Sequence, residues 1–258
     1  MDDYTYLSGT DRPLLDAPWR VGSLLPWASE SLAELSLGDR LIAVTDDAVS
    51  PEGAFAAAER VGPVGAPDVA RVIGLEPDLI IVGPDHDSVI EAAHDAAIPI
   101  WMADPQSVRD AFNHLWDWMN LFEVPQMVAR VRALEWTCDW LERLAETRSL
   151  ARIVVVAEPG SAWACSTRYS ADLIRICGGD LCAPIGLLTE ETICECGPEA
   201  ILVDEALPDA MIKALTALRT PASRAGKVWP VDMRLLTWPG TRMARAFESL
   251  PNLISLTD

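Results

Sequence analysis

No apolar run in the 258-residue sequence approaches the ~20 residues that a membrane-spanning helix needs. The first residues, Met1 to Tyr6, contain neither the basic stretch nor the apolar core of a secretory signal. We therefore expect a cytoplasmic protein, and a periplasmic or lipid-anchored one if a leader has been removed. The six cysteines form no Cys-x-x-Cys pair, and no two of them are placed by the sequence to close a loop, so we expect six reduced thiols.

Basic residues are scarce relative to acidic ones. The chain has 20 Lys and Arg against 39 Asp and Glu, which gives a net charge of −19 and a pI near 4.4. Binding to nucleic acid depends on Lys and Arg that neutralise phosphates, and docking to anionic lipid depends on the same residues. The composition therefore argues against both kinds of partner.

The motifs of common enzymes are also missing. The sequence contains no Walker loop, dinucleotide-type glycine pattern, nucleophile elbow or His-Glu-x-x-His. Cys177, followed by two glycines, indicates the end of a helix more than a reactive thiol. Three histidines share no metal-ligand spacing, although His86 lies between Asp85 and Asp87. That trio could bind a divalent cation, or it could simply begin a helix, where aspartates are favoured. We expect no catalytic residues.

Half of the residues are apolar, and they fall in short runs that alternate with helical patterns. Such alternation predicts an α/β protein with mostly parallel sheets. The expected strands are Val21–Leu25, Leu41–Thr45, Leu79–Gly83, Ile98–Ala103, Ile153–Ala157, Ala200–Val203 and Val228–Val231.

The chain repeats itself weakly. Leu75–Val82 is similar to Cys196–Val203 at an offset of 121 residues, and Ile100–Asp104 is similar to Val228–Asp232 at an offset of 128. The near-equal offsets predict two Rossmann-like lobes of one design. The alternative explanation of the repeat is chance similarity between buried strands. We expect an N-terminal extension over 1–19, lobes over 20–105 and 148–258, and connecting and backbone helices over 106–147.

A long helical stretch separates the two lobes. Residues 125–146 contain no Gly or Pro after the initial Pro125, enough for roughly 33 Å of helix. Apolar residues at spacings of three and four give it one buried stripe, which we expect Trp136, Trp140 and Leu144 to widen. A stiff helix that joins two lobes predicts a ligand cleft between them, lined by the loops that follow the strands.

Three of the ten tryptophans fall in such loops. Trp27, Trp163 and Trp238 each follow an expected strand. Their indole faces could hold a large flat ligand, although each could instead pack within its loop.

The sequence resembles the class III periplasmic substrate-binding proteins, which have a helical backbone. It is most similar to the cobalamin-binding members and to their signal-less relatives, the helical-backbone metal receptors. The resemblance spans about Arg20 to Ile254 and rests on motifs in a fixed order. These are Arg20–Pro26 followed by Glu30, Gly38–Thr45, Val61-Gly62 before Pro67-Asp68, Leu75–Ile80, Ile176–Asp180, and Val231-Asp232 with Leu236–Arg242.

The resemblance implies a non-catalytic protein that holds cobalamin, haem, a siderophore or a metal ion between its lobes and delivers it to an ABC importer. No cofactor is required; the bound ligand would be cobalamin or another tetrapyrrole or metal chelate. Polar contacts are expected from Asp47, Asp85, His86, Tyr169 and Arg242. The alternatives are a divalent-metal-binding protein and a chelatase-like or metallocluster-handling protein.

Two departures from the family pattern concern the ligand and the importer. Aromatic residues of the cobalamin binders are expected at Asp47, near Val64 and within Pro84–His86, where this chain has none. The glutamate that docks to the importer falls at Glu191 in the second lobe, but its counterpart falls at Ala70. We therefore expect docking to be absent or altered, unless Asp68 takes that role.

Overall fold

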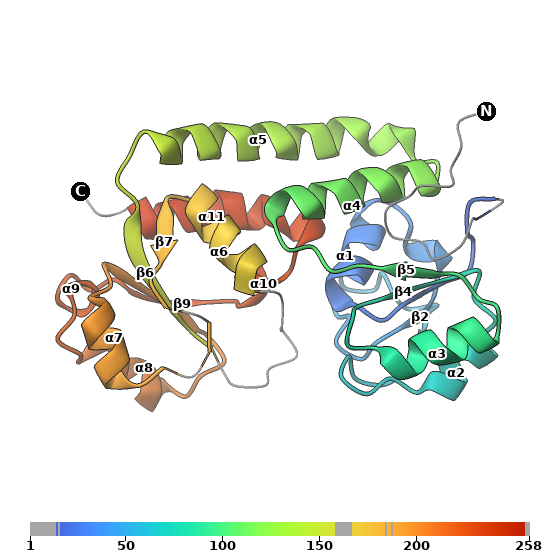
Figure 1. The fold of residues 1–258 in the computed structure, drawn as a ribbon, viewed down its shortest axis with the longest axis horizontal. Helices are drawn as coiled ribbons and strands as arrows, with labels where there is room; N and C mark the ends of the chain where they lie inside the picture. The colour runs from blue at the N-terminus through green and yellow to red at the C-terminus, as the bar shows by residue number, and fades with distance from the viewer. Residues whose placement is uncertain (1–13, 15, 158–166, 184, 187, 256–258) are drawn as a thin grey trace. The chain divides into compact units, whose positions relative to one another are not determined.

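The computed structural model describes residue 14 and residues 16–157, 167–183, 185–186 and 188–255 (Figure 1). Contacts divide the chain into two compact units. The N-terminal unit consists of Met1–Pro105, Arg109–Val131 and Pro239–Thr241, and the C-terminal unit of Gln106–Val108, Arg132–Trp238 and Arg242–Asp258. Among the described residues, no helix combines the length and the apolar character that crossing a bilayer requires.

The N-terminal unit is built on a five-stranded parallel sheet in the order β3-β2-β1-β4-β5. Its strands are β1 (Val21–Ser23), β2 (Leu41–Val44), β3 (Glu59–Arg60), β4 (Leu79–Val82) and β5 (Ile100–Met102). Its helical segments are α1 (Pro26–Glu34), η2 (Gly38–Arg40), α2 (Val69–Gly74), α3 (Asp87–Asp95), α4 (Val108–Leu121) and η3 (Pro125–Met127). Val72 of α2 and Val89 of α3 pack with Ile80 and Val82 on one face of the sheet.

The C-terminal unit has a four-stranded parallel sheet in the order β7-β6-β8-β9. Its strands are β6 (Ala151–Val156), β7 (Gly179–Leu181), β8 (Ala200–Asp204) and β9 (Val228–Val231). Its helical segments are α6 (Thr167–Ile176), α7 (Glu190–Cys196), α8 (Asp209–Thr216), α9 (Pro221–Arg224), α10 (Arg234–Thr237), η4 (Gly240–Arg242) and α11 (Met243–Ser255).

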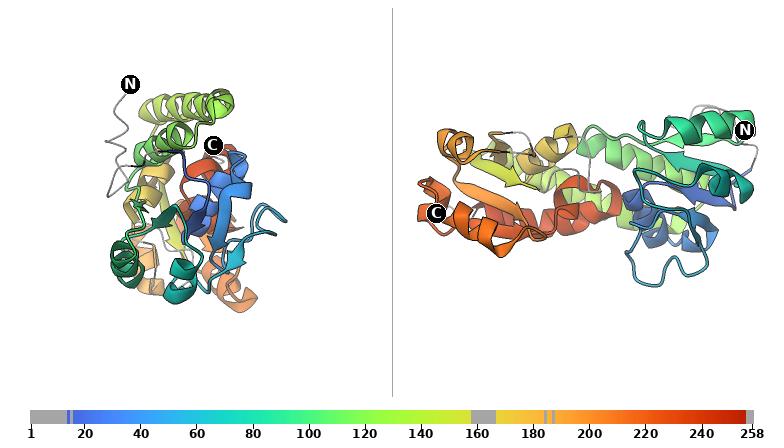
Figure 2. Two further views of the ribbon diagram at one scale, coloured as in Figure 1. Left: turned by 90° about the vertical axis from the view of Figure 1, so that its right-hand side faces the viewer. Right: turned by 90° about the horizontal axis from the view of Figure 1, so that it is seen from below.

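Successive side chains of β6 point to opposite faces of this second sheet. Val154 and Val156 pack with residues of α7 and α8, such as Ile193 and Leu215. The opposite face carries α6 and α11, as Figure 2 also shows. A parallel sheet covered on both faces reads as continuous apolar runs, which is why the sequence identifies its central strands.

The structure confirms the predicted α/β fold with parallel sheets. The two repeated segments are equivalent strands: β4 and β8 each lie one place inside the sheet, and β5 and β9 each follow at its edge. The sequence missed β3 and β7. Both are edge strands of two or three residues, and neither needs an apolar run because each pairs on one side only.

Helix α5 (Val128–Glu146) runs without interruption over 19 residues. Val131, Cys138, Leu141 and Ala145 are buried along one face, as predicted. The prediction that Trp136 and Trp140 widen this face was wrong, because they are 68% and 62% exposed. At about 100° per residue, each tryptophan lies about 160° around the helix from Cys138 or further, so both project from the opposite side.

A cluster of aromatic rings fills the core beside β5. Trp27 stacks on Trp118 at 5.7 Å between centroids, and His114 lies 6.0 Å from Trp118 and 6.0 Å from Trp101. The indole N–H of Trp101 donates to Nδ1 of His114 at 3.3 Å. Burial lowers the pKa of His114 and outweighs the nearby Asp117, which raises it. The folded state therefore favours the neutral imidazole.

We predict that the free energy of unfolding falls as the pH drops from 7.5 to about 5.5. The unfolded chain takes up a proton at His114 near its ordinary pKa of ~6.5, whereas the folded state resists it. Urea denaturation at both pH values measures the effect. The decline should be shallower in His114→Gln and unchanged in His94→Gln, whose histidine is exposed. Equal pH slopes in the native chain and His114→Gln would contradict this.

Gly240 occupies a position that other residues cannot fill. Its φ of 87° lies in the left-handed region, and a Cβ there would collide with the hydroxyl of Ser31 on α1. The same hydroxyl accepts a hydrogen bond from the Thr241 N–H at 3.2 Å. The segment Pro239–Thr241 is thus fixed against α1 of the N-terminal unit.

Gly240→Ala should lower the free energy of unfolding by about 2–4 kcal/mol, through backbone strain and the collision with Ser31. Gly226→Ala is the matched control, because Gly226 also has a positive φ of 71° but faces open space. It should cost only about 1 kcal/mol. Equal losses in chemical denaturation would remove Ser31 from the explanation.

Candidate functional site

In the N-terminal unit, the predicted site residues lie at the carboxyl ends of the parallel strands. Trp27 follows β1, Asp47 follows β2, and Asp85 and His86 follow β4. Parallel strands bring these ends to one edge of the sheet, which is where such sheets place ligands. The structure places Asp47, Asp85 and His86 in the loops where the sequence predicted them, whereas Trp27 lies in the first turn of α1 and not in a loop.

Asp47 and His86 meet at the backbone of Val64. The carboxylate of Asp47 accepts the Val64 N–H at 2.8 Å, and Nε2 of His86 donates to the Val64 carbonyl at 3.1 Å. Nδ1 of His86 accepts the Gly83 N–H at 3.2 Å, so the tautomer with hydrogen on Nε2 satisfies both contacts. His86 is 7% exposed. The two side chains therefore hold the loop around Val64 in place at the strand ends.

Asp85 differs from its neighbour because it is exposed. It is the carboxylate of this loop that can reach a bound molecule without rearrangement. Both nitrogens of His86 are already engaged with backbone groups. Within the described ranges, no three His, Cys, Asp or Glu side chains lie close enough to share a metal ion.

Trp27 is 8% exposed and is covered by the ring of Trp118. Residue 163, the second predicted wall, lies outside the described residues. The third, Trp238, is 2% exposed and belongs to the C-terminal unit. The indole faces of Trp27 and Trp238 therefore pack against protein side chains in this structure.

In the C-terminal unit, the structure brings together Tyr169, Trp238 and Arg242. The hydroxyl of Tyr169 donates to the Trp238 carbonyl at 3.4 Å. The guanidinium carbon of Arg242 lies 5.1 Å from the centroid of the Trp238 ring, within cation–π distance. Tyr169 is fully buried and Arg242 is 3% exposed, so these groups form a rigid support after β9.

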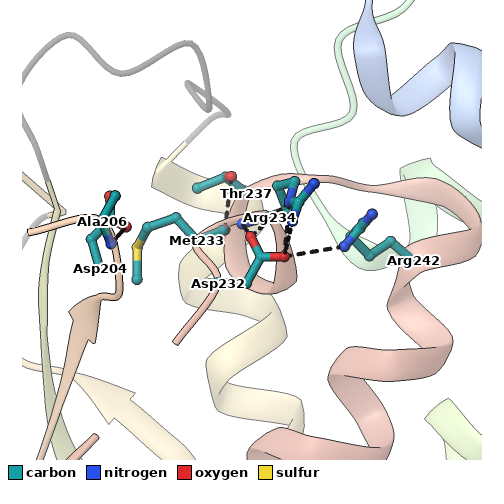
Figure 3. A network of polar contacts seen from close by, with 7 residues as sticks. All are labelled: Asp204, Ala206, Asp232, Met233, Arg234, Thr237 and Arg242. Atoms are coloured by element: carbon teal, nitrogen blue, oxygen red, sulfur yellow. Dashed lines mark hydrogen bonds and ion pairs between the residues drawn. The ribbon is translucent and has the colours of Figure 1, made fainter. Parts of the chain in front are cut away.

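Asp232 and Arg234 belong to the same cluster and were missed as site residues (Figure 3). Asp232 accepts from Nε of Arg234 at 2.8 Å and contacts Nη1 of Arg242 at 3.4 Å. Burial raises the pKa of Asp232, but hydrogen bonds from Arg234 and the charges of both arginines outweigh it and lower the pKa overall. Asp232 thus remains ionised between two guanidiniums.

Beside Asp232, whose side chain is 22% exposed, Arg234 presents the accessible positive charge of this cluster. Its side chain is 24% exposed, and its guanidinium carbon lies 5.8 Å from the centroid of the Trp238 ring. The only sequence signal was the pairing of Asp232 with Arg234 directly after β9. A partly exposed guanidinium beside an indole can bind an anionic group that is attached to a planar ligand.

Asp204 ends β8 at the same edge and is 2% exposed. Its Oδ1 accepts the Ala206 N–H at 2.9 Å (Figure 3). Its buried Oδ2 has no hydrogen-bond partner in the described part of the chain. The carboxyl edge of this sheet is therefore polar, and one of its buried carboxylate oxygens lacks a hydrogen-bond partner among the described residues.

The two docking positions lie on helix surfaces. Glu191 is exposed in the first turn of α7, whose N-cap Thr189 accepts the Thr192 N–H at 3.2 Å. Ala70 is exposed on α2, and Asp68 is the N-cap of that helix. The carboxylate of Asp68 accepts the Arg71 N–H at 3.1 Å, which gives this side chain a structural role.

Comparison with known proteins shows several relatives, although no family model matches. A vitamin B12-binding protein of Vibrio parahaemolyticus is 25% identical over 243 residues, covering 88% of this chain and 86% of the relative. A vitamin B12-binding protein of Vibrio vulnificus is 25% identical over 247 residues, covering 90% and 88%.

Solved structures show the same fold. The periplasmic vitamin B12-binding protein BtuF of Vibrio cholerae superposes with a TM-score of 0.75 at 20% identity, covering 93% of this chain and 98% of that one. The periplasmic haem-binding protein RhuT of Roseiflexus sp. RS-1 gives 0.73 at 18%, covering 92% and 98%. Helicobacter pylori CeuE with bound Ni(II) gives 0.75 at 14%, covering 95% and 85%.

The predicted resemblance is thus confirmed: along most of its length the chain is similar to vitamin B12-binding proteins, and it has the fold of the class III periplasmic substrate-binding proteins.

Proposed function

We propose that this chain is a non-catalytic binding protein for a corrinoid or another tetrapyrrole metal chelate. The observation that carries the proposal is the similarity to vitamin B12-binding proteins over about nine-tenths of the chain. The polar and aromatic residues at the carboxyl ends of both sheets support it. Hydrogen bonds between these residues hold them in fixed positions, which suits binding.

The chemistry of the accessible residues favours a ligand with both planar and anionic parts. Tetrapyrrole chelates combine a large flat ring with carboxylate, amide or phosphate substituents. Arg234 offers a guanidinium beside an indole, and Asp85 offers a free carboxylate that can accept from amide N–H groups. Binding of a bare divalent cation has less support, because the described residues contain no cluster of three ligating side chains.

The comparisons favour a periplasmic location over a cytoplasmic one. BtuF of Vibrio cholerae and RhuT of Roseiflexus sp. RS-1 are periplasmic binding proteins. They lend no support to the cytoplasmic expectation and agree with its alternative, a periplasmic or lipid-anchored protein. We propose the latter location.

A role in transport would follow from that location. We propose that an ABC importer permease is the partner and that Glu191 supplies the charge contact of the C-terminal unit. The exposed Ala70 supplies no matching charge. Docking would therefore be slower and less well oriented than a contact with two glutamates, since paired charges chiefly set orientation and association rate.

We predict that titration with cyanocobalamin and with haemin distinguishes the ligands. Binding of either should change its visible absorption spectrum at a 1:1 ratio. Arg234→Gln should weaken binding of the preferred chelate by about 5- to 50-fold, as expected from the loss of one charge-assisted contact. Arg224→Gln is the control, because Arg224 is exposed on α9 away from the strand carboxyl ends.

The outcomes are distinct. No spectral change with either chelate would refute the proposed function. Binding that is equally strong in Arg234→Gln and the native chain would keep the function but remove Arg234 from the site. Thermal melts of both variants report whether the fold is retained.

A second prediction concerns the remaining predicted tryptophan. Trp163→Ala should weaken binding of the chelate by about 1–3 kcal/mol, or roughly 5- to 150-fold, whereas Trp116→Ala should change stability alone. Isothermal titration measures both. Equal losses of affinity would remove the role of Trp163 as a wall of the site.

A further inference from the structure

The outward face of α5 carries an exposed aromatic ridge. Trp136 and Trp140 lie one helical turn apart and are 68% and 62% exposed, the values of side chains largely open to solvent. Surface tryptophans normally lie against other groups because their rings are large and apolar. At about 100° per residue, Ala129 continues the same ridge at one end, and Thr147, the first residue after α5, continues it at the other. All four residues are exposed.

The ridge is complementary to itself when two copies of α5 run antiparallel. If Trp136 of one copy faces Trp140 of the other, the residue numbers of facing positions sum to 276. Ala129 then faces Thr147, so that small side chains oppose each other where the helices must approach. The two pairs of indoles meet in the middle, and the arrangement has the two-fold symmetry of an isologous dimer.

The charged residues beside the ridge also favour the antiparallel direction. Residues 132, 135, 139, 143 and 146 project from one flank of the ridge, and residues 133, 137 and 144 from the other. An antiparallel pair brings charged flank against charged flank in reverse order. Arg132 then reaches Glu146 of the second copy, and Glu135, which also pairs with Arg132 of its own chain at 3.0 Å, reaches Arg143. This gives four opposite-charge pairs across the axis against one like-charge contact, between the two copies of Asp139 at the centre. A parallel pair would instead place the charged flank against the uncharged one.

We propose that this chain forms a homodimer through an antiparallel pairing of α5, with Trp136 and Trp140 at its centre. Four indoles that are two-thirds exposed would bury roughly 400–650 Å². A specific interface needs at least about 1,000 Å², so the flanks of the helix must contribute the rest. The dimer is therefore of modest affinity and dissociates on dilution.

Sedimentation equilibrium of the full chain over a 100-fold concentration range tests the proposal. The native chain should pass from monomer to dimer. Trp136→Ala with Trp140→Ala should raise the dissociation constant at least 10-fold. Trp19→Ala is the matched control, because Trp19 is 67% exposed in a different segment, and it should leave the equilibrium unchanged. A native chain that stays monomeric, or a double variant that dimerises as well as the native chain, would overturn the proposal.

Cysteine cross-linking tests the direction of the helices. In a Cys194→Ser background, mixed chains of Ala129→Cys and Thr147→Cys should form a disulfide with each other when oxidised glutathione accepts the two electrons. Neither chain should form one with itself. Self-linked Ala129→Cys would show a parallel pair and refute the arrangement. Arg132→Glu should weaken the dimer, and Arg132→Glu combined with Glu146→Arg should restore it; failure of both would refute the charge pairing.

Discussion

The parallel pairing of strands is the constraint on which the site depends. In each unit every strand runs in the same direction, so all the chain segments that leave a strand at its carboxyl end emerge at one edge. Residues that are far apart in the sequence are collected there. Asp47 and His86 are 39 positions apart, yet both contact the backbone of Val64. In the second unit, Tyr169 reaches the backbone of Trp238 in the same way.

At both edges, backbone carbonyls and ionised side chains hold the aromatic and charged residues. The clearest case is Arg242, which is 3% exposed and would carry a large desolvation cost if it were alone. Asp232 compensates for that cost, and its own charge is stabilised by Arg234. The accessible parts of this group are the outer arginine and Asp232, whose side chains are 24% and 22% exposed. An edge organised in this way holds two guanidiniums around one carboxylate in a protein whose net charge is −19.

The sequence predicted the central strands well because each is a short apolar run buried on both faces. It could not predict β3, whose Glu59 and Arg60 carry no such pattern, or β7, which contains a glycine. For the candidate site, it placed Asp47, Asp85 and His86 in loops that follow strands, since a loop is found as soon as its strand is found. It could not identify the position of Arg234, because that position depends on how Asp232 and Trp238 fold around it. The burial of Trp136 and Trp140 was wrongly inferred from their apolar character, although their angular position on α5 places them outside.

The short segment Pro239–Thr241 has a consequence for how the protein can be divided. It contributes to the N-terminal unit, where Gly240 and Thr241 contact Ser31, although both of its neighbours along the chain, Trp238 and Arg242, belong to the C-terminal unit. The N-terminal unit is therefore not encoded by one continuous stretch. A gene cut within α5 therefore yields a first fragment without Pro239–Thr241, which leaves the hydroxyl of Ser31 without its contact to Thr241.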